Sequence, residues 1–543
     1  MAAVNLDVDL AHHSCLHCRN LKRKCSRELP SCSLCIRLRK RCTYESSKSA
    51  VFSRSPQDET QDDLPEQSLL FHLLPSSLAH HPSIIPARTF LDSESSSPTP
   101  INVYPHVTIP EKVLGMLGSR HEMHSVYVRY FSVLHKWLPI LSQKDTSEDI
   151  IDIGPRSKIS LVLLALAMKL LTSALKPGEQ AMSPLYQETK NLASRIESCG
   201  LITLQLVQSI VLLSVYEIGH AIYPAAYLSV SQAARLGTLL GFHNRMKLQI
   251  FTKPDTWTLR EQERRTWWAT LLLDCFVHLG ISGLPLASPT PHNGELLPCA
   301  EQSWESGSVG FNQPLFLQNL PADAQMGSFA ATCQSAHLLG SVIRHRDQTD
   351  IDDRGLVLSE AHQLHRALHT LNLYLRRLCF VDQVALEKSH FTAFALCCSA
   401  RFVLYEIYAC NEHYPSSGPR IPEEIAMQQF SLEGISKSID DVYLLTEHIL
   451  RFASVSDQDS VSRLSPLFCH CLYQSISECA WLYREEKGLH RAAQLKTLIQ
   501  GLETLGTCWK VVGHYMSILE EENALAVVAD ETMTYEEDAR LSY

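Results

Sequence analysis

Several features that mark other classes of protein are missing from this chain of 543 residues. Its longest uninterrupted apolar run, Leu161–Met168, is far shorter than the roughly 18–20 residues of a membrane-spanning helix. The N-terminus lacks the basic start and apolar core of a secretory signal. The chain contains no G-x-S-x-G motif, no phosphate-binding loop and no dinucleotide fingerprint. We therefore expect no membrane partner, reduced cysteines and no enzymatic activity.

Charge is unevenly distributed along the chain. The whole sequence carries a formal net charge of −10. Residues 15–44 nevertheless contain nine Lys or Arg and a single acid, Glu28, so this stretch is at +8 and the remainder is at −18. A dense basic island in an otherwise acidic protein indicates a confined anionic partner, such as nucleic acid.

Six of the 18 cysteines lie in the same island and form a repeat. The motif C-x2-C-x6-C occurs twice, 17 residues apart, at Cys15, Cys18, Cys25, Cys32, Cys35 and Cys42. Two zinc ions in closed tetrahedral sites need eight ligand positions, and six thiolates fill them when two sulfurs bridge both metals. The symmetry of the repeat assigns the bridges to equivalent positions, for which we favour Cys15 and Cys32. A disulfide framework and a pair of unrelated zinc knuckles are the alternatives.

This repeat resembles the fungal zinc binuclear cluster regulators, a family of six-cysteine, two-zinc transcription factors. The stretch Cys15-Leu-His-Cys-Arg-Asn-Leu-Lys-Arg-Lys-Cys25 follows the family pattern C-x2-C-R-x-R/K-K-x-K-C, except that Leu21 stands where a basic residue is usual. Pro30 falls where the family turns between its halves, and Tyr44 also fits. The resemblance implies two structural Zn²⁺ ions and a short helix after each C-x2-C. It also implies that the end of the first helix enters the major groove of double-stranded DNA at a CGG-like triplet.

The resemblance also assigns the DNA contacts. Lys22 is expected to read a base, since a cation can donate to the N7 and O6 acceptors of guanine. The residues expected on or near phosphate, where contacts fix the register, are Arg19, Arg23 and Lys24. A second basic cluster, which includes Arg39 and Lys40, faces either phosphate or solvent. The two clusters together would serve as a nuclear import signal, so we expect the protein in the nucleus.

Composition divides the chain into further segments around the cluster of residues 15–44. Residues 1–14 are expected to be disordered, and so is the linker 45–110, which holds nine of the 26 prolines and thirteen serines. These prolines leave no interval long enough for a dimerising coiled coil. Residues 111–519 are predicted to form a large all-α regulatory domain, which makes the protein mostly α. Residues 520–543 carry eight acids among hydrophobic residues, typical of either a segment that binds a coactivator or a solvated tail.

Helical periodicity is strong in the all-α region. Apolar residues recur at three and four positions over 124–137, and residues 159–173 are apolar almost all round, which predicts a fully buried helix. A helix over 224–241 would start at a proline and end at a glycine cap. Thr258 and Glu261 have the spacing of a capping box for the next helix.

Between 120 and 290 the chain is similar to the middle homology region of the same family, notably at Glu263-Arg-Arg-x-Trp-Trp268. Asp274 is expected to be a buried acid paired with an arginine rather than a catalyst. Residues 280–325, with six prolines and five glycines, form either an inserted loop or the lid of an effector pocket. The Cys397-Cys398 and Cys469-His-Cys471 clusters are expected to be core residues rather than metal ligands.

These features predict a zinc-dependent, sequence-specific transcription factor that acts on RNA polymerase II promoters. The resemblance implies control of either nutrient use or a secondary-metabolite gene cluster, and the sequence does not choose between the two. A single triplet occurs about once in 64 positions, far too often to identify a promoter, so a homodimer or a partner regulator must supply a second reading head. The alternatives are a repressor or scaffold without activation function and an enzyme tethered to DNA by the cluster.

Overall fold

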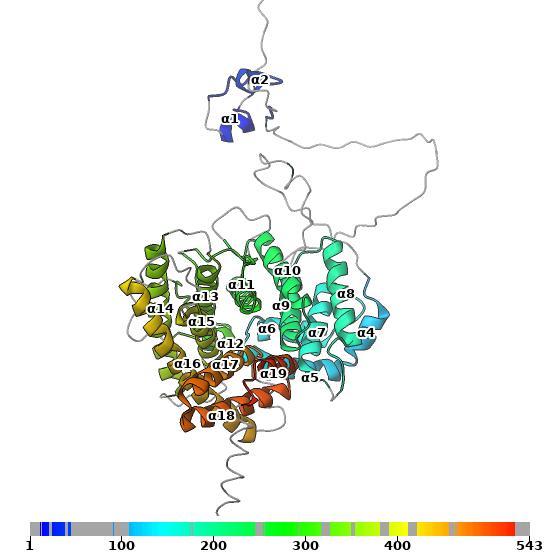
Figure 1. Ribbon diagram of the computed structural model, residues 1–543. Coiled ribbons are helices and arrows are strands. Elements are labelled where there is room, and N and C mark those ends of the chain that lie inside the picture. The colour runs from blue at the N-terminus through cyan, green and yellow to red at the C-terminus, as the bar shows by residue number, and fades with distance from the viewer. Residues whose placement is uncertain are drawn as a thin grey trace, which may run out of the picture. The chain divides into compact units, whose positions relative to one another are not determined.

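The computed structural model of the chain describes residues 11–526 with gaps (Figure 1). The residues outside it are 1–10, 12, 21–23, 38–41, 45–90, 92–107, 174, 176–177, 245–253, 255, 293, 316–325, 349–352, 381–389, 411–420, 456–460, 462–463 and 527–543. The chain divides into two compact units, residues 1–70 and 71–543. Most of the predicted linker 45–110 and most of the acidic segment 520–543 lie outside the described residues.

The first unit contains two short helices, α1 (Leu16–Asn20) and α2 (Ser33–Arg37), which contact each other. Each helix begins one residue after the first cysteine of its half-repeat, so the duplication in the sequence is also a duplication in the structure. The resemblance placed the helices after each C-x2-C, whereas here they include its second cysteine. One helical turn brings positions i and i+3 to the same side, which directs both sulfurs of each C-x2-C inward.

The second unit is all-α and contains no β-strand in the residues described. Its helices are α4 (Glu111–Leu117), α5 (Arg120–Val133), the 3₁₀ helix η1 (Leu134–Lys136), α6 (Gln143–Ile151), α7 (Ile159–Thr172), α8 (Pro184–Ser198), α9 (Leu204–Gly219), α10 (Ala225–Leu239), α11 (Trp257–Val277), α12 (Glu301–Ser306), α13 (Ser328–Asp347), α14 (Arg354–Phe380), α15 (Phe391–Ala409), α16 (Pro422–Val455), α17 (Phe468–Glu486), α18 (Leu489–Gly506) and α19 (Val511–Glu521). One continuous apolar core runs from Val113 in α4 to Ala524 after α19. The predicted mostly-α fold is confirmed.

Three of the predicted helices lie close to their expected positions. Helix α5 together with η1 covers the 124–137 pattern, and α7 covers 159–173 with nearly every side chain buried. Helix α10 follows Pro224 and ends before Gly241, which has φ 78°. Glycine adopts this left-handed conformation without the steric cost that a Cβ would add, which is why it ends the helix there.

Helix α11 begins earlier than the sequence indicated. Its N-cap is Thr256, whose hydroxyl accepts a hydrogen bond from the backbone nitrogen of Leu259 at 3.2 Å. The predicted capping box of Thr258 and Glu261 is therefore wrong. Thr256 and Thr258 are both residues that can cap a helix start. Glu261 is fully buried and pairs with Arg265 one turn later, so its carboxylate is not available to cap the helix.

Helix α15 is the only helix in the described part of the chain that is long and apolar enough, by length and composition, to cross a membrane. Within the structure, however, 89% of its apolar window is buried. It packs against α13, α14, α16 and α17. We therefore interpret α15 as the central core helix of the body.

Candidate zinc and DNA-binding site

Four of the six repeat cysteines form a buried cage between α1 and α2. The sulfurs of Cys15, Cys18, Cys32 and Cys35 all lie within 4.8 Å of one another, and each of the four residues is completely buried. Cys25 and Cys42 are partly buried and pack against this group. All 18 cysteines are free thiols, so the structure contains no disulfide framework.

The first cysteine of each half reaches into the other half. The sulfur of Cys15 lies 3.8 Å from that of Cys32 and 3.7 Å from that of Cys35. The sulfur of Cys32 in turn lies 3.6 Å from that of Cys18. These two sulfurs therefore occupy the centre of the cage, where a ligand shared between two metal ions has to lie.

Backbone N–H groups point at the sulfurs in the same way in both halves. Cys18 N donates to Cys15 Sγ at 3.4 Å, and its counterpart Cys35 N donates to Cys32 Sγ at 3.5 Å. The third cysteine of each half accepts an equivalent hydrogen bond: Cys15 N donates to Cys25 Sγ, and Cys32 N donates to Cys42 Sγ. A donor directed at sulfur stabilises its anionic form, which is the form that binds metal.

The thiols differ in how readily they ionise without metal. Burial, followed by the neighbouring sulfurs of Cys15 and Cys32, raises the pKa of Cys18 to about 12, and burial likewise raises the pKa of Cys35. Burial also opposes ionisation of Cys25, but backbone donors outweigh it and lower its pKa to about 6. Adjacent thiolates repel each other, so such a cage needs cations to ionise fully. The donor set, six sulfurs with no oxygen ligand, fits zinc, and a closed sulfur site makes its role structural.

The two halves are joined by polar contacts that the spacing did not indicate. Tyr44 donates its hydroxyl proton to the backbone oxygen of Glu28 at 2.9 Å, and this hydroxyl lies 4.0 Å from Cys25 Sγ. Ser33 at the start of α2 donates its backbone N–H to Ser26 Oγ at 2.9 Å. Serine is too common for its position alone to have predicted this link.

The predicted DNA-contact residues are only partly within the described residues. Arg19 in α1 and Lys24, which follows the helix, both have exposed side chains. The remaining predicted contacts, Lys22, Arg23, Arg39 and Lys40, lie outside the described residues. Arg27 and Arg37 are also exposed and add to the positive surface around the cage.

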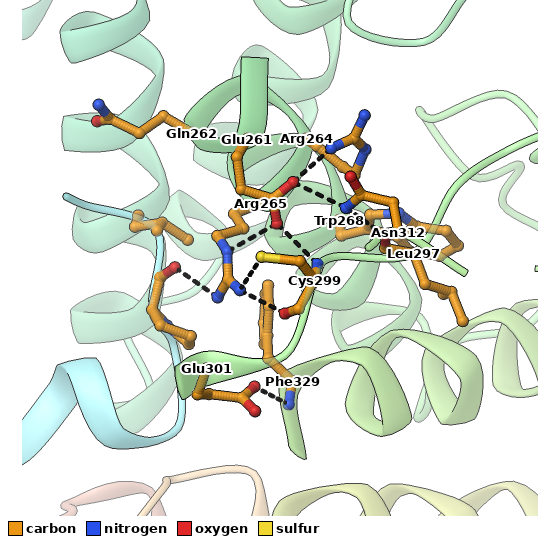
Figure 2. Close-up of polar contacts among 12 residues, drawn as sticks. Glu261, Gln262, Arg264, Arg265, Trp268, Leu297, Cys299, Glu301, Asn312 and Phe329 are labelled. Atoms are coloured by element: carbon orange, nitrogen blue, oxygen red, sulfur yellow. Dashed lines mark hydrogen bonds and ion pairs between the residues drawn. The ribbon is translucent and has the colours of Figure 1, made fainter. Parts of the chain in front are cut away.

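A buried ion-pair network in the helical body includes both arginines of the middle-region motif, Arg264 and Arg265 (Figure 2). Glu261 Oε1 accepts from Arg265 Nε at 3.0 Å and from Cys299 N at 2.9 Å, and its Oε2 accepts from Arg264 and Asn312. Burial would raise the pKa of Glu261, but the charges of Arg265 and Arg264 outweigh it and lower the pKa.

Arg265 extends this network to two other parts of the body. Its guanidinium donates to the backbone oxygens of Pro139 and Cys299, at 3.3 and 2.7 Å, and lies 4.7 Å from the centre of the Trp304 ring. The described residues of 280–325 are thereby fastened to α11. The Glu261 carboxylate and the Arg265 guanidinium are occupied by each other, by backbone groups and by the side chains of Arg264 and Asn312, so we interpret the network as structural.

Asp274 is buried as predicted, but its partner is different. Its Oδ2 accepts from the backbone N–H and the hydroxyl of Ser288, at 2.7 and 2.5 Å, and its Oδ1 lies 3.6 Å from His278 Nδ1. The prediction of an arginine partner is therefore wrong. A loop that folds back onto the helix supplies Ser288, and helical periodicity carries no information about that return.

The other cysteine clusters are core residues, as predicted. Cys397, Cys398, Cys469 and Cys471 are completely buried, and burial raises the pKa of Cys397 to about 12. The cage around Cys15 is the one group in the described residues with ligand atoms close enough to hold a metal ion.

Comparison with known families agrees with this geometry. Residues 13–50 match the family described as the fungal Zn(2)-Cys(6) binuclear cluster domain. Residues 128–372 match the fungal specific transcription factor domain.

Three similar proteins are themselves regulators. Transcription factor BOA15 of Botryotinia fuckeliana is 34% identical over 177 residues, which are 32% of this chain and 97% of that protein. The azaphilone cluster-specific transcription factor azaR of Aspergillus niger is 26% identical over 38% of this chain and 46% of its own length. The negative regulator of pleiotropic drug resistance STB5 of Candida glabrata is 36% identical over 13% of this chain and 6% of its own length.

Proposed function

This chain belongs to the fungal Zn(2)-Cys(6) binuclear cluster family of transcription factors, and from this premise we propose that it reads CGG-like triplets in the promoters of a secondary-metabolite gene cluster. It is a DNA-binding transcription factor whose cluster domain binds two zinc ions. We propose that it acts in the nucleus. The observation that carries the proposal is the two-fold repeated cysteine cage with exposed basic side chains around it.

In the proposed metal centre, Cys15 and Cys32 bridge the two ions, and each ion is completed by further cysteines. The support is that the sulfurs of Cys15 and Cys32 each lie within 3.8 Å of two sulfurs of the other half, whereas those of Cys18 and Cys35 each contact one. Six thiolates and two Zn²⁺ leave the cluster with two negative charges, which the surrounding arginines and lysines compensate. The zinc ions supply folding energy and hold the helices in place, and they take no part in a reaction.

In the proposed DNA complex, Lys22 donates to a guanine edge and Arg19, Arg23 and Lys24 contact phosphate. The support is that Arg19 and Lys24 are exposed on either side of the segment that contains Lys22. Arg39 and Lys40 add phosphate contacts from the second half. Leu21 cannot contact phosphate in this way, so we expect lower affinity than a basic residue there would give.

The proposed target is a biosynthetic gene cluster, because one of the similar proteins is named as a cluster-specific regulator. Mapping the genomic binding sites of the tagged protein tests this directly. We expect paired CGG-like triplets concentrated in the promoters of one cluster, and loss of binding in a Cys15→Ser variant. Cys199→Ser, at an exposed cysteine outside the repeat, is the matched control. Sites without triplets, or scattered over unrelated genes, would contradict the proposal.

The direction of regulation has two candidates. We propose activation through coactivators that bind residues 520–543, because this segment interleaves acids with hydrophobic side chains. Repression is the second candidate, since another similar protein is named as a negative regulator. Fusing residues 500–543 to a heterologous DNA-binding domain decides between them: activation predicts increased reporter transcription, and repression predicts none. Family membership also argues against the alternative of an enzyme tethered to DNA. Turnover of a metabolite by the purified helical body would support that alternative.

A further inference from the structure

A recess lies between α11, α13 and the loop that follows α11, and we call it the α11–α13 recess. Trp268 and Leu271 of α11 are buried and form its floor, whereas Leu286 and Pro291 of the loop are only partly buried and lie toward its open side. Arg344 of α13 also lines it. The recess has about 250 Å³ of unfilled space up to its open side, and its enclosed part, about 10 Å³, holds one water-sized group.

The walls of the α11–α13 recess are mostly apolar and none of the lining residues is acidic. Burial, followed by the charge of Arg344, lowers the pKa of the lining His337 to about 4, so its imidazole is neutral at neutral pH. Burial raises the pKa of the lining Cys275 to about 12, and the hydroxyl of Ser288 donates to Asp274 at 2.5 Å. The one formal charge on the wall of the recess is therefore positive.

That charge, on Arg344, forms no ion pair with an acid in the described part of the chain. Its guanidinium donates to Ser341 Oγ, a neutral group, at 3.3 Å. The acids whose charges reach it are engaged elsewhere, since Glu360 pairs with His345 at 2.9 Å and Asp274 accepts from the loop. The side chain is nevertheless partly buried, and this burial lowers the pKa of Arg344. A guanidinium withdrawn from water without a counter-charge is costly, so an anion that supplied one would bind favourably.

Gly340 allows the two helices to approach each other at the recess. A Cβ at this position would lie 2.8 Å from the sulfur of Cys275 in α11 and 3.5 Å from a terminal nitrogen of Arg344. Any larger residue would therefore move either α13 away from α11 or the guanidinium away from the recess. The close approach of α11 and the position of the charge thus depend on the same glycine.

We propose that the α11–α13 recess binds a small organic carboxylate, with the carboxylate group at Arg344 and the apolar part of the molecule against Leu286 and Pro291. A carboxylate matches the forked donors of a guanidinium with two parallel hydrogen bonds. The enclosed part has room for one oxygen, and the open side has room for a short hydrocarbon chain that covers the apolar wall. An inorganic anion would leave that wall exposed to water.

The proposal gives the loop a role in binding. Leu286 and Pro291 become part of the wall of a ligand site, which is one of the two roles that the sequence left open for residues 280–325. The recess lies in the helical body and includes none of the cluster cysteines, so the inference goes beyond DNA reading and stands independently of the proposed target genes.

The test is isothermal titration calorimetry of the zinc-loaded full-length protein, with sodium hexanoate as the probe. We expect one binding event per chain with a Kd at or below about 1 mM. Two matched probes separate the contributions of charge and chain. Hexanol carries the same chain without the charge, and sodium acetate carries the charge with almost no chain. Both should bind at least about tenfold more weakly than hexanoate.

Variants locate the site. Arg344→Gln should weaken hexanoate binding at least about tenfold, and Arg344→Lys, which keeps the charge without the fork, should recover part of it. Leu286→Asp should also weaken binding, because it places a negative charge beside the bound carboxylate. Arg235→Gln, at an exposed arginine of α10 outside the recess, is the matched control and should change nothing. Circular dichroism checks that each variant is folded. Absence of hexanoate binding overturns the inference, as does hexanol binding as tightly as hexanoate or binding that both Arg344→Gln and Leu286→Asp leave unchanged.

Discussion

The cysteine cluster and the helical body are stabilised by opposite means. In the cluster, the buried side chains of its core are four cysteines, with Leu34 and Tyr44 among the partly buried neighbours. The body has a continuous apolar core that reaches from α4 to the end of α19. A unit of about 30 residues cannot bury enough apolar surface to fold alone, whereas a unit of about 400 residues can. The comparison shows that one chain can contain a unit that needs metal and a unit that needs only the exclusion of water.

Zinc removal should show most clearly that the cluster needs metal to fold and the helical body does not. The metal supplies about 10 kcal/mol or more of folding free energy per site, so chelation should abolish DNA binding. The helical signal of the body should persist, because its core contains no metal ligand group in the residues described. Gel-shift and circular dichroism measurements on the same chelated sample check both outcomes.

The stoichiometry of the metal provides the control. Native mass spectrometry of residues 1–50 should find two zinc ions, and a single ion would contradict the bridged cluster. A large loss of helical signal on chelation would show that the two units do not fold independently.

Breaking the buried ion pair of the body should destabilise the body and leave DNA binding by the cluster intact. Arg265→Met leaves the carboxylate of Glu261 buried without its main partner, which should lower the free energy of unfolding by about 3–5 kcal/mol. Thermal unfolding should show the loss, while binding of a single triplet at low temperature stays unchanged. Arg195→Met, at an exposed position, should change neither quantity. Weaker triplet binding in Arg265→Met would mean that the two units are coupled.

Within the cluster unit, base reading and phosphate contact should be separable. Lys22→Ala should cost about 1–3 kcal/mol on the cognate triplet and relax its specificity. Arg23→Ala should weaken all sequences alike and flatten the salt dependence by about one unit of slope. Binding isotherms on cognate and scrambled DNA at several salt concentrations make the distinction. If both variants lose affinity equally on both DNAs, Lys22 is only a phosphate contact.

The smallest effect is expected when the spacing between two triplets is changed. A dimeric body that carries its clusters on the predicted disordered linker 45–110 should tolerate variation, because effective concentration changes slowly with distance. We expect affinity to vary by less than about tenfold as the half-sites are moved apart one base pair at a time. A sharp optimum would contradict the flexible linker, and full affinity for a lone half-site would contradict the second reading head.

The helix α11 illustrates how far local patterns reach. Its apolar face and its two tryptophans were readable from spacing, and the helix is present. The role of Glu261 could not be predicted from the sequence, because a glutamate near a helix start has the same spacing in a capping box as in a buried ion pair. The partner of Asp274 was missed for a different reason, since a loop returns Ser288 to the helix and helical spacing does not predict that return.

The sequence by itself determined the metal site and the class of fold. A repeated cysteine spacing specifies its ligands locally, because one turn of helix and one short loop bring the sulfurs together, and apolar periodicity specifies helices in the same local way. Only the tertiary structure decided which helices became neighbours. The buried pairing of Glu261 with Cys299 and Asn312 depends on it, as does the recess between α11 and α13. Such contacts join residues tens of positions apart. They form because two polar groups buried together away from water must satisfy each other, and local sequence patterns do not show which groups are buried together.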